Sequence, residues 1–188
     1  MAEREHRVKT QASSSKATQK PQLNLQPLPT AAQVIEWLRY DPATGSFTWA
    51  KRGRGVRFGH PAGTMHKDGR REICILGRRH KAARLAWLIV WGVWPEGLID
   101  HENGIPSDDR IDNLRDVTNK VNIQNQRRAQ VSNKSSKLLG VTRRRAGKWQ
   151  ARLMIDGKNL CVGTFDTPEA AHEAYLAAKR THHQGCTI

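Results

Sequence analysis

The chain has 188 residues, in which 32 lysines and arginines face 17 acidic residues, giving a formal net charge of +15. This length suits one ordinary domain or two small ones, and an apolar share of 37% favours small modules over one large core. The charge favours a polyanionic partner, with nucleic acid as the first choice over a membrane surface.

No apolar run reaches transmembrane length, and the first residues lack the apolar core of a signal peptide. We therefore expect a cytoplasmic protein with access to DNA and no membrane partner. The three cysteines, Cys74, Cys161 and Cys186, contain no C-x-x-C pair, so neither a disulfide framework nor a zinc ribbon is indicated. They are expected to be free thiols.

Residues 1–30 are rich in Ser, Gln, Lys, Thr and Pro and are predicted to be a disordered basic tail, because they bury too little apolar surface to offset the ordering entropy. An apolar pattern at helical spacing follows Thr30, a possible cap, and predicts a helix ending near Tyr40. A turn over 41–45 and an alternating strand over 46–49 come next.

A hairpin is predicted over 63–80, with its turn at 67–70. The most apolar segment, 81–91, has helical spacing and is expected to end at Gly92, so it is the candidate core of the first module. Arg84 on this helix is a candidate phosphate contact.

The stretch 98–126 carries the residues suited to chemistry. Asp100 offers an anionic oxygen and Asn122 a neutral amide oxygen, which are ligand types that suit Mg²⁺ with its other positions left to water and phosphate. His101 can take a proton from water near neutral pH. On a strand, the side chains of Asp100 and His101 would point to opposite faces, so one of them could hold a metal ion while the other acts at a different position.

Between these residues lies a polar loop over 102–110 with several acids. Asp108 and Asp109 can be read as extra metal ligands, but solvation of a loop is the interpretation we favour. A helix over about 117–127 is predicted to present Asn122.

The ordered set of Asp100-His101, Asn113 and Asn122 resembles the HNH endonuclease family, in particular its phage and intron-encoded homing type. The preceding segment 84–95, with Arg-Leu-Ala-Trp and Gly-Val-Trp-Pro, is similar to the helix and turn that lead into the motif. One departure is that Asn122 stands where many members have a final histidine, a change that the homing subgroup tolerates.

The resemblance implies a unit of two strands and a helix that grips one divalent ion, Mg²⁺ or Mn²⁺. By the same resemblance, Asp100 and Asn122 are the metal ligands and His101 is the general base. Asn113 orients the loop that carries the base.

Residues 131–138 have the composition of a linker, and 139–183 predict a second module with one open sheet face. Its strands are expected over 139–142, 148–155 and 158–165, with a helix beginning after Thr167. On the second strand, Trp149 and Ala151 alternate with Gln150 and Arg152, and only one of these sets can face a partner.

Gly140-Val141, the segment 149–152, the segment 163–166 and the alanine-rich helix together resemble the Apetala-type, or ethylene-response-factor, DNA-binding domain, which occurs fused to homing HNH nucleases. That domain inserts a three-stranded sheet into the major groove. The resemblance implies DNA contacts from Arg143, Arg145, Trp149, Arg152 and Lys158. Arginine can bond guanine in bidentate fashion, whereas a lysine more often meets phosphate.

The expected fold is α+β: a small ββα-metal HNH nuclease module over 31–130, followed by a DNA-binding module of a three-stranded antiparallel sheet plus a helix. The expected activity is metal-dependent hydrolysis of phosphodiester bonds in double-stranded DNA. With one motif the chain has one active centre, so a monomer should nick. The alternatives are a DNA-binding regulator with a decayed nuclease unit and a basic RNA-binding structural protein, and the latter leaves the order of the motif unexplained.

Overall fold

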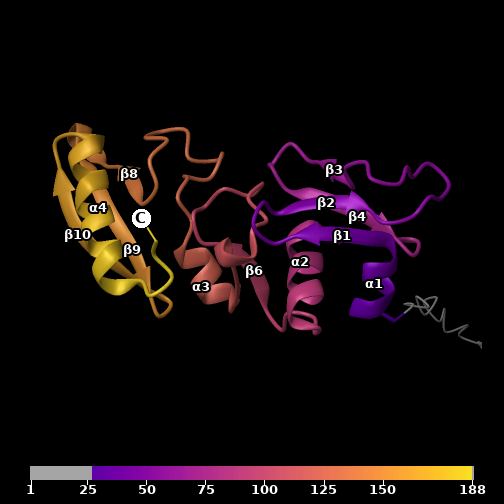
Figure 1. The fold of residues 1–188 in the computed structure, drawn as a ribbon. Coiled ribbons are helices and arrows are strands. Elements are labelled where there is room, and N and C mark those ends of the chain that lie inside the picture. The colour runs from indigo at the N-terminus through magenta and orange to yellow at the C-terminus, as the bar shows by residue number, and fades with distance from the viewer. Residues whose placement is uncertain (1–26, 188) are drawn as a thin grey trace, which may run out of the picture.

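The computed structural model describes residues 27–187, which form short helices and four antiparallel sheets (Figure 1). The predicted α+β class is therefore confirmed. Most of the predicted 1–30 tail lies outside the described residues, but its end is fixed, since the Trp94 indole donates to the Pro29 carbonyl at 2.9 Å and Thr30 caps the first helix. Within residues 27–187, no helix combines the length and hydropathy needed to cross a membrane.

The first helix, α1 (Ala31–Trp37), is shorter than predicted. The chain becomes extended at Leu38 and forms β1 (Leu38–Asp41), which pairs with β2 (Ser46–Trp49). This pairing places Leu38 and Phe47 in the core, where each is 1% exposed. The prediction of a helix to Tyr40 was wrong because burial of Leu38 in a hairpin outweighs the continuation of a helical pattern.

The predicted hairpin over 63–80 is confirmed as β3 (Thr64–Met65) and β4 (Arg71–Ile75), with β5 (Arg78–Lys81) on the other side of β4. α2 (Ala82–Trp91) follows at once and ends as predicted at Gly92, whose φ of 76° is left-handed and costs glycine little. In Figure 1, α1 and α2 lie on the same side of β1, β2 and β4. The core between these layers consists of Val34, Leu38, Phe47, Ala62, Ile73, Ile75, Ala82, Ala83, Leu85, Ala86, Leu88 and Leu114.

The next elements are β6 (Leu98–His101), the 3-10 turn η1 (Ile111–Asn113), β7 (Leu114–Val117) and α3 (Asn119–Gln124). β6 and β7 pair antiparallel, with Leu98 opposite Val117 and His101 opposite Leu114. The helix predicted over 117–127 is thus shorter at both ends. Its first residue follows the Thr118 cap, because the residues before it are held in the strand pairing.

The last part holds β8 (Val141–Arg143), η2 (Arg145–Gly147), β9 (Trp149–Ile155), β10 (Lys158–Phe165) and α4 (Pro168–His182). The strand order is β10-β9-β8, and α4 lies along one face of this sheet (Figure 1). A second hydrophobic cluster lies between them, built on Val141, Ala151, Leu153, Ala171 and Tyr175. The three predicted strands and the predicted helix start after Thr167 are confirmed, while the assignment of separate nuclease and DNA-binding units stays a prediction.

Gly140 at the start of this part gives a stability test. Its φ is +75°, and an added Cβ would lie 2.0 Å from Cδ2 of Tyr175. We expect Gly140→Ala to lower the free energy of unfolding by about 2 to 5 kcal/mol, because left-handed strain and overpacking add. Gly157→Ala is the matched control, since Gly157 has a φ of +78° and no atom of residues 27–187 lies within 4 Å of the added Cβ.

Urea unfolding of both variants measures the difference. The control should show the backbone strain alone, about 1 kcal/mol. Equal destabilisation of the two variants would mean that the Tyr175 ring does not press on Gly140.

Candidate active site and nucleic-acid interface

β6 presents Asp100 and His101 to opposite sides of the β6-β7 pair, as the alternation of a strand requires. Both side chains are removed from solvent, at 7% and 8% exposure. The two neighbours therefore have different surroundings.

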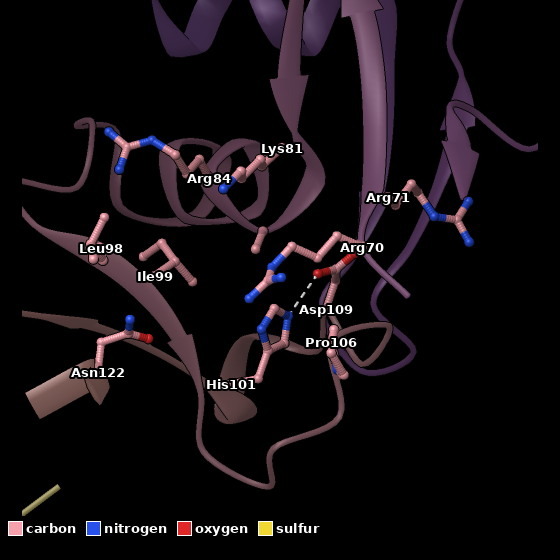
Figure 2. Close-up of a pocket in the computed structure, with 11 residues that line it drawn as sticks. Arg70, Arg71, Lys81, Arg84, Leu98, Ile99, His101, Pro106, Asp109 and Asn122 are labelled. Carbon is pink, nitrogen blue, oxygen red and sulfur yellow. Dashed lines mark hydrogen bonds and ion pairs between the residues drawn. The ribbon is translucent and has the colours of Figure 1, made fainter. Parts of the chain in front are cut away.

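His101 is paired with a buried carboxylate. Its Nε2 lies 3.1 Å from Oδ1 of Asp109, which is only 2% exposed (Figure 2). The Tyr40 hydroxyl donates to the Asp109 carbonyl at 2.7 Å, which fixes the backbone that carries this carboxylate. With a proton on Nε2 directed at Asp109, the other ring nitrogen is left as an acceptor, which is the form a general base needs.

The interpretation of Asp109 as a solvated loop residue was therefore wrong. The sequence offers two adjacent acids and no local signal for which one is buried. The structure separates them: Asp109 turns inward, whereas Asp108 accepts from the Arg110 guanidinium at 2.6 Å. That contact lowers the pKa of Asp108 to about 2.

Asn113 ties together both ends of the loop that separates His101 from Asp109. Its Oδ1 accepts from the backbone of Asn103 at 2.9 Å, and its Nδ2 donates to the carbonyl of Asp108 at 2.7 Å. The side chain is 8% exposed. These contacts suit the loop-orienting role that the HNH resemblance implies, and a catalytic contribution of Asn113 stays a prediction.

His101 and Asp109 open on a pocket that Asn122 also lines, together with the cationic residues Arg70, Arg71, Lys81 and Arg84. Figure 2 shows the Arg70 guanidinium turned towards His101 and the Arg71 side chain turned away. Arg84 is tied to the backbone, because it donates to the carbonyls of Gly97 at 2.8 Å and Pro95 at 3.1 Å. A phosphate contact of Arg84, as predicted, would have to use the N–H groups of its guanidinium that do not bind these two carbonyls.

On the other side of the strand, Asp100 is held by two donors. Nε and a terminal nitrogen of Arg115 lie 2.9 and 2.8 Å from Oδ2, and Nδ2 of Asn125 lies 2.9 Å from the same oxygen. Sequence reasoning missed both. Arg115 stands directly opposite Asp100 in the β6-β7 register, so predicting that hairpin would have revealed it.

The structure does not bring the two predicted metal ligands, Asp100 and Asn122, together: Asp100 is held by Arg115 and Asn125 on the other side of β6 from His101. Among the described residues, Oδ1 of Asp100 accepts one hydrogen bond, from Asn125 at 3.2 Å, so it keeps lone pairs for a cation. In the part of the chain that the structure describes, Asn122 lines the pocket shared by His101 and Asp109, and Asp100 does not line it. No group of three or more His, Cys, Asp or Glu side chains suited to a metal occurs in residues 27–187. Two ligands completed by water and phosphate suit Mg²⁺.

A basic histidine, a carboxylate that orients it and a separate carboxylate with spare acceptor capacity are the groups of a hydrolytic site acting on a phosphate. Residues 80–124 match the model of a family described as HNH endonuclease. The matched span contains α2, β6, β7 and α3 and the four predicted motif residues, so this part of the chain is supported as an HNH nuclease domain. A comparison with curated proteins gave no match.

The predicted DNA contacts of the last part do not share one face of the sheet. Trp149 packs against the cluster under α4, and Arg143 stands opposite Trp149, with its guanidinium carbon 5.9 Å from the ring centroid. Lys158 pairs with Ile155 and belongs to the same side. Arg145 lies in the η2 turn.

Arg152 lies on the opposite, open face, across from Cys161. Its Nε donates to Oε1 of Gln150 at 2.7 Å, and the side chain is exposed. Only one of the predicted contacts on the strands, Arg152, therefore points away from α4, and Gln150 and Thr142 share its face.

Proposed function

We propose that the chain is a metal-dependent HNH endonuclease of the homing type that hydrolyses phosphodiester bonds in double-stranded DNA. The observation that carries this proposal is the His101-Asp109 pair, which opens on a cation-lined pocket within the segment that matches the HNH model. The net charge of +15 suits a DNA substrate.

In this proposal His101 takes the proton of the attacking water, and Asp109 holds the ring in the tautomer that can accept it. Asp100 and Asn122 would hold one Mg²⁺ or Mn²⁺, which when bound would supply positive charge at the scissile phosphate. Arg70 and Lys81 line the same pocket and add charge next to the phosphate. The expected products carry 5′-phosphate and 3′-hydroxyl ends.

The test is nicking of supercoiled plasmid DNA with Mg²⁺, compared with the same reaction in excess EDTA. A monomer with one active centre should give open circles before any linear form. A chain that binds DNA but leaves it intact at every Mg²⁺ and Mn²⁺ concentration would favour the alternative, a DNA-binding regulator with a decayed nuclease unit.

The last part of the chain is proposed to read DNA through the open face of its sheet, which the Apetala-type resemblance favours and which leaves Arg152 best oriented for base contact. Arg152→Ala should reduce discrimination between the preferred site and other sequences by about 1 to 3 kcal/mol. Lys158→Ala, a comparison variant of equal charge change on the other face, should weaken binding to all sequences alike or leave it unchanged.

Competition binding with the selected site and a scrambled duplex measures both variants. An Arg152→Ala protein with the parental sequence preference would contradict base reading by the open face.

A further inference from the structure

Residues 183–187, called here the 183–187 segment, run from the end of α4 to the active-site part of the chain. The segment starts beside the β10-β9-β8 sheet, where His183 Nε2 lies 2.8 Å from the Met154 carbonyl. It then reaches α3, where the Gly185 backbone donates to the Gln124 side chain at 3.2 Å. The segment therefore bridges the two hydrophobic clusters.

Gly185 shows how closely the segment lies on α3. A Cβ at this position would stand 2.4 Å from the carbonyl oxygen of Val121 and 2.9 Å from its Cγ1. The buried Lys179 of α4 makes a second tie, because its ammonium donates to the Gln126 carbonyl. The segment is thus a packed connection and leaves no room for a side chain at Gly185.

Thr187 contacts the group that holds the Asp100 carboxylate. Its hydroxyl lies 2.5 Å from Oδ1 of Asn125, and Nδ2 of that amide donates to Asp100 and, at 3.1 Å, to the His101 carbonyl. The amide has one accepting end and one donating end. A donor at Oδ1 therefore keeps Nδ2 turned towards the carboxylate.

Arg127 leaves the Thr187 proton available for this role. Its terminal nitrogen donates to the Thr187 hydroxyl oxygen at 2.7 Å and to the Glu102 carbonyl at 2.9 Å. The Thr187 hydroxyl proton has two acceptors in reach, the Glu102 carbonyl at 2.6 Å and Oδ1 of Asn125 at 2.5 Å. The Glu102 carbonyl also accepts from Arg127, whereas among the described residues Thr187 is the donor to Oδ1 of Asn125.

Arg115, the other residue that binds the Asp100 carboxylate, also contacts the 183–187 segment. Arg115 donates to Asp100 and also, at 3.2 Å, to the Gly185 carbonyl. Both groups that fix the Asp100 carboxylate are thus bonded to the 183–187 segment, which begins in the part of the chain proposed to read DNA.

We propose that Thr187 is a positioning residue for the Asp100 carboxylate, and that the 183–187 segment couples the placement of the DNA-reading part to the metal site. This inference rests on the proposed function, because it gives Asp100 its role as a metal ligand. Without the Thr187 hydroxyl, the Asn125 amide loses the donor that fixes its direction, and the carboxylate loses a defined orientation.

The test uses the full chain with Thr187→Val, which keeps the shape and removes the hydroxyl. Mn²⁺ binding without DNA, followed by the signal of free Mn²⁺ in electron paramagnetic resonance, should weaken by about tenfold, the order expected for one buried hydrogen bond lost. The Mg²⁺ concentration for half-maximal nicking should rise by a similar factor. Thr187→Ser keeps the hydroxyl and should restore both values.

Thr181→Val is the matched control, because that exposed hydroxyl donates within α4, to the Ala177 carbonyl at 3.1 Å. It should leave Mn²⁺ binding unchanged. If Thr187→Val does not fold, Gly185→Ala displaces the segment by a different route and should weaken Mn²⁺ binding in the same way.

Parental Mn²⁺ affinity in Thr187→Val, or equal weakening in Thr187→Ser, would overturn the positioning role. A parental chain that cuts no DNA contradicts the proposed nuclease instead, and the Mn²⁺ measurement still decides on Thr187.

Discussion

Replacing His101 with alanine is expected to slow DNA cleavage by about 10² to 10⁴, the usual effect of losing a general base. The side chain is buried, pairs with Asp109 and opens on the cation-lined pocket, which is where the attacking water of the proposed reaction would lie. Asp100 and its donors lie on the other side of β6, and Mn²⁺ binding should therefore remain near the parental value.

Single-turnover nicking of supercoiled plasmid at saturating Mg²⁺ measures this effect. Raising the Mg²⁺ concentration should not restore the rate, since the metal ligands are intact. His60→Ala, which removes an exposed histidine from a loop, is the control and should cut at the parental rate. If His101→Ala nicks DNA as fast as the parent, His101 is a structural residue and the base must be sought elsewhere in the chain.

Local signals in the sequence predicted much of the fold. The helix that ends at Gly92 and the helix that begins after Thr167 were found because a left-handed glycine and a capping threonine act on their immediate neighbours. The turn at Asp156-Gly157 was found for the same reason, since both residues take positive φ, 47° and 78°. These elements depend on residues a few positions apart.

Features that depend on distant residues were missed. Leu38 leaves the helical pattern because it pairs with Trp49 across a hairpin. Asp109 becomes a buried partner of His101 because Tyr40, 69 positions away, binds its carbonyl. The identities of these residues can be read from the sequence, but local patterns do not predict which distant residues come into contact.

The two faces of the β10-β9-β8 sheet could be predicted only in part. Alternation along β9 predicted that Trp149 and Arg152 face opposite sides, and the burial of the α4 side decides which side is open. The register then moves Arg143 and Lys158 to the α4 side, which the clustering of basic residues along the chain did not indicate.

Asp109→Asn is expected to reduce the rate of nicking by up to about 10⁴, the order of the loss when a carboxylate beside a catalytic histidine is changed to an amide. The amide has the same shape, but its NH₂ end can donate to Nε2 of His101. The ring proton would then sit on the nitrogen that must accept from water. Asp108→Asn is the matched control on the adjacent acid, which binds Arg110 and Asn103 instead of His101, and its loss should be much smaller.

The double variant His101→Ala, Asp109→Asn decides whether Asp109 acts through His101. If it does, the double variant should nick no more slowly than His101→Ala alone, because residues that act as a unit are not additive. Single-turnover rates of the four proteins complete the cycle. A further slowing in the double variant, equal to the effect of Asp109→Asn in the parental chain, would show that Asp109 acts independently of the histidine and would contradict its role as the orienting carboxylate.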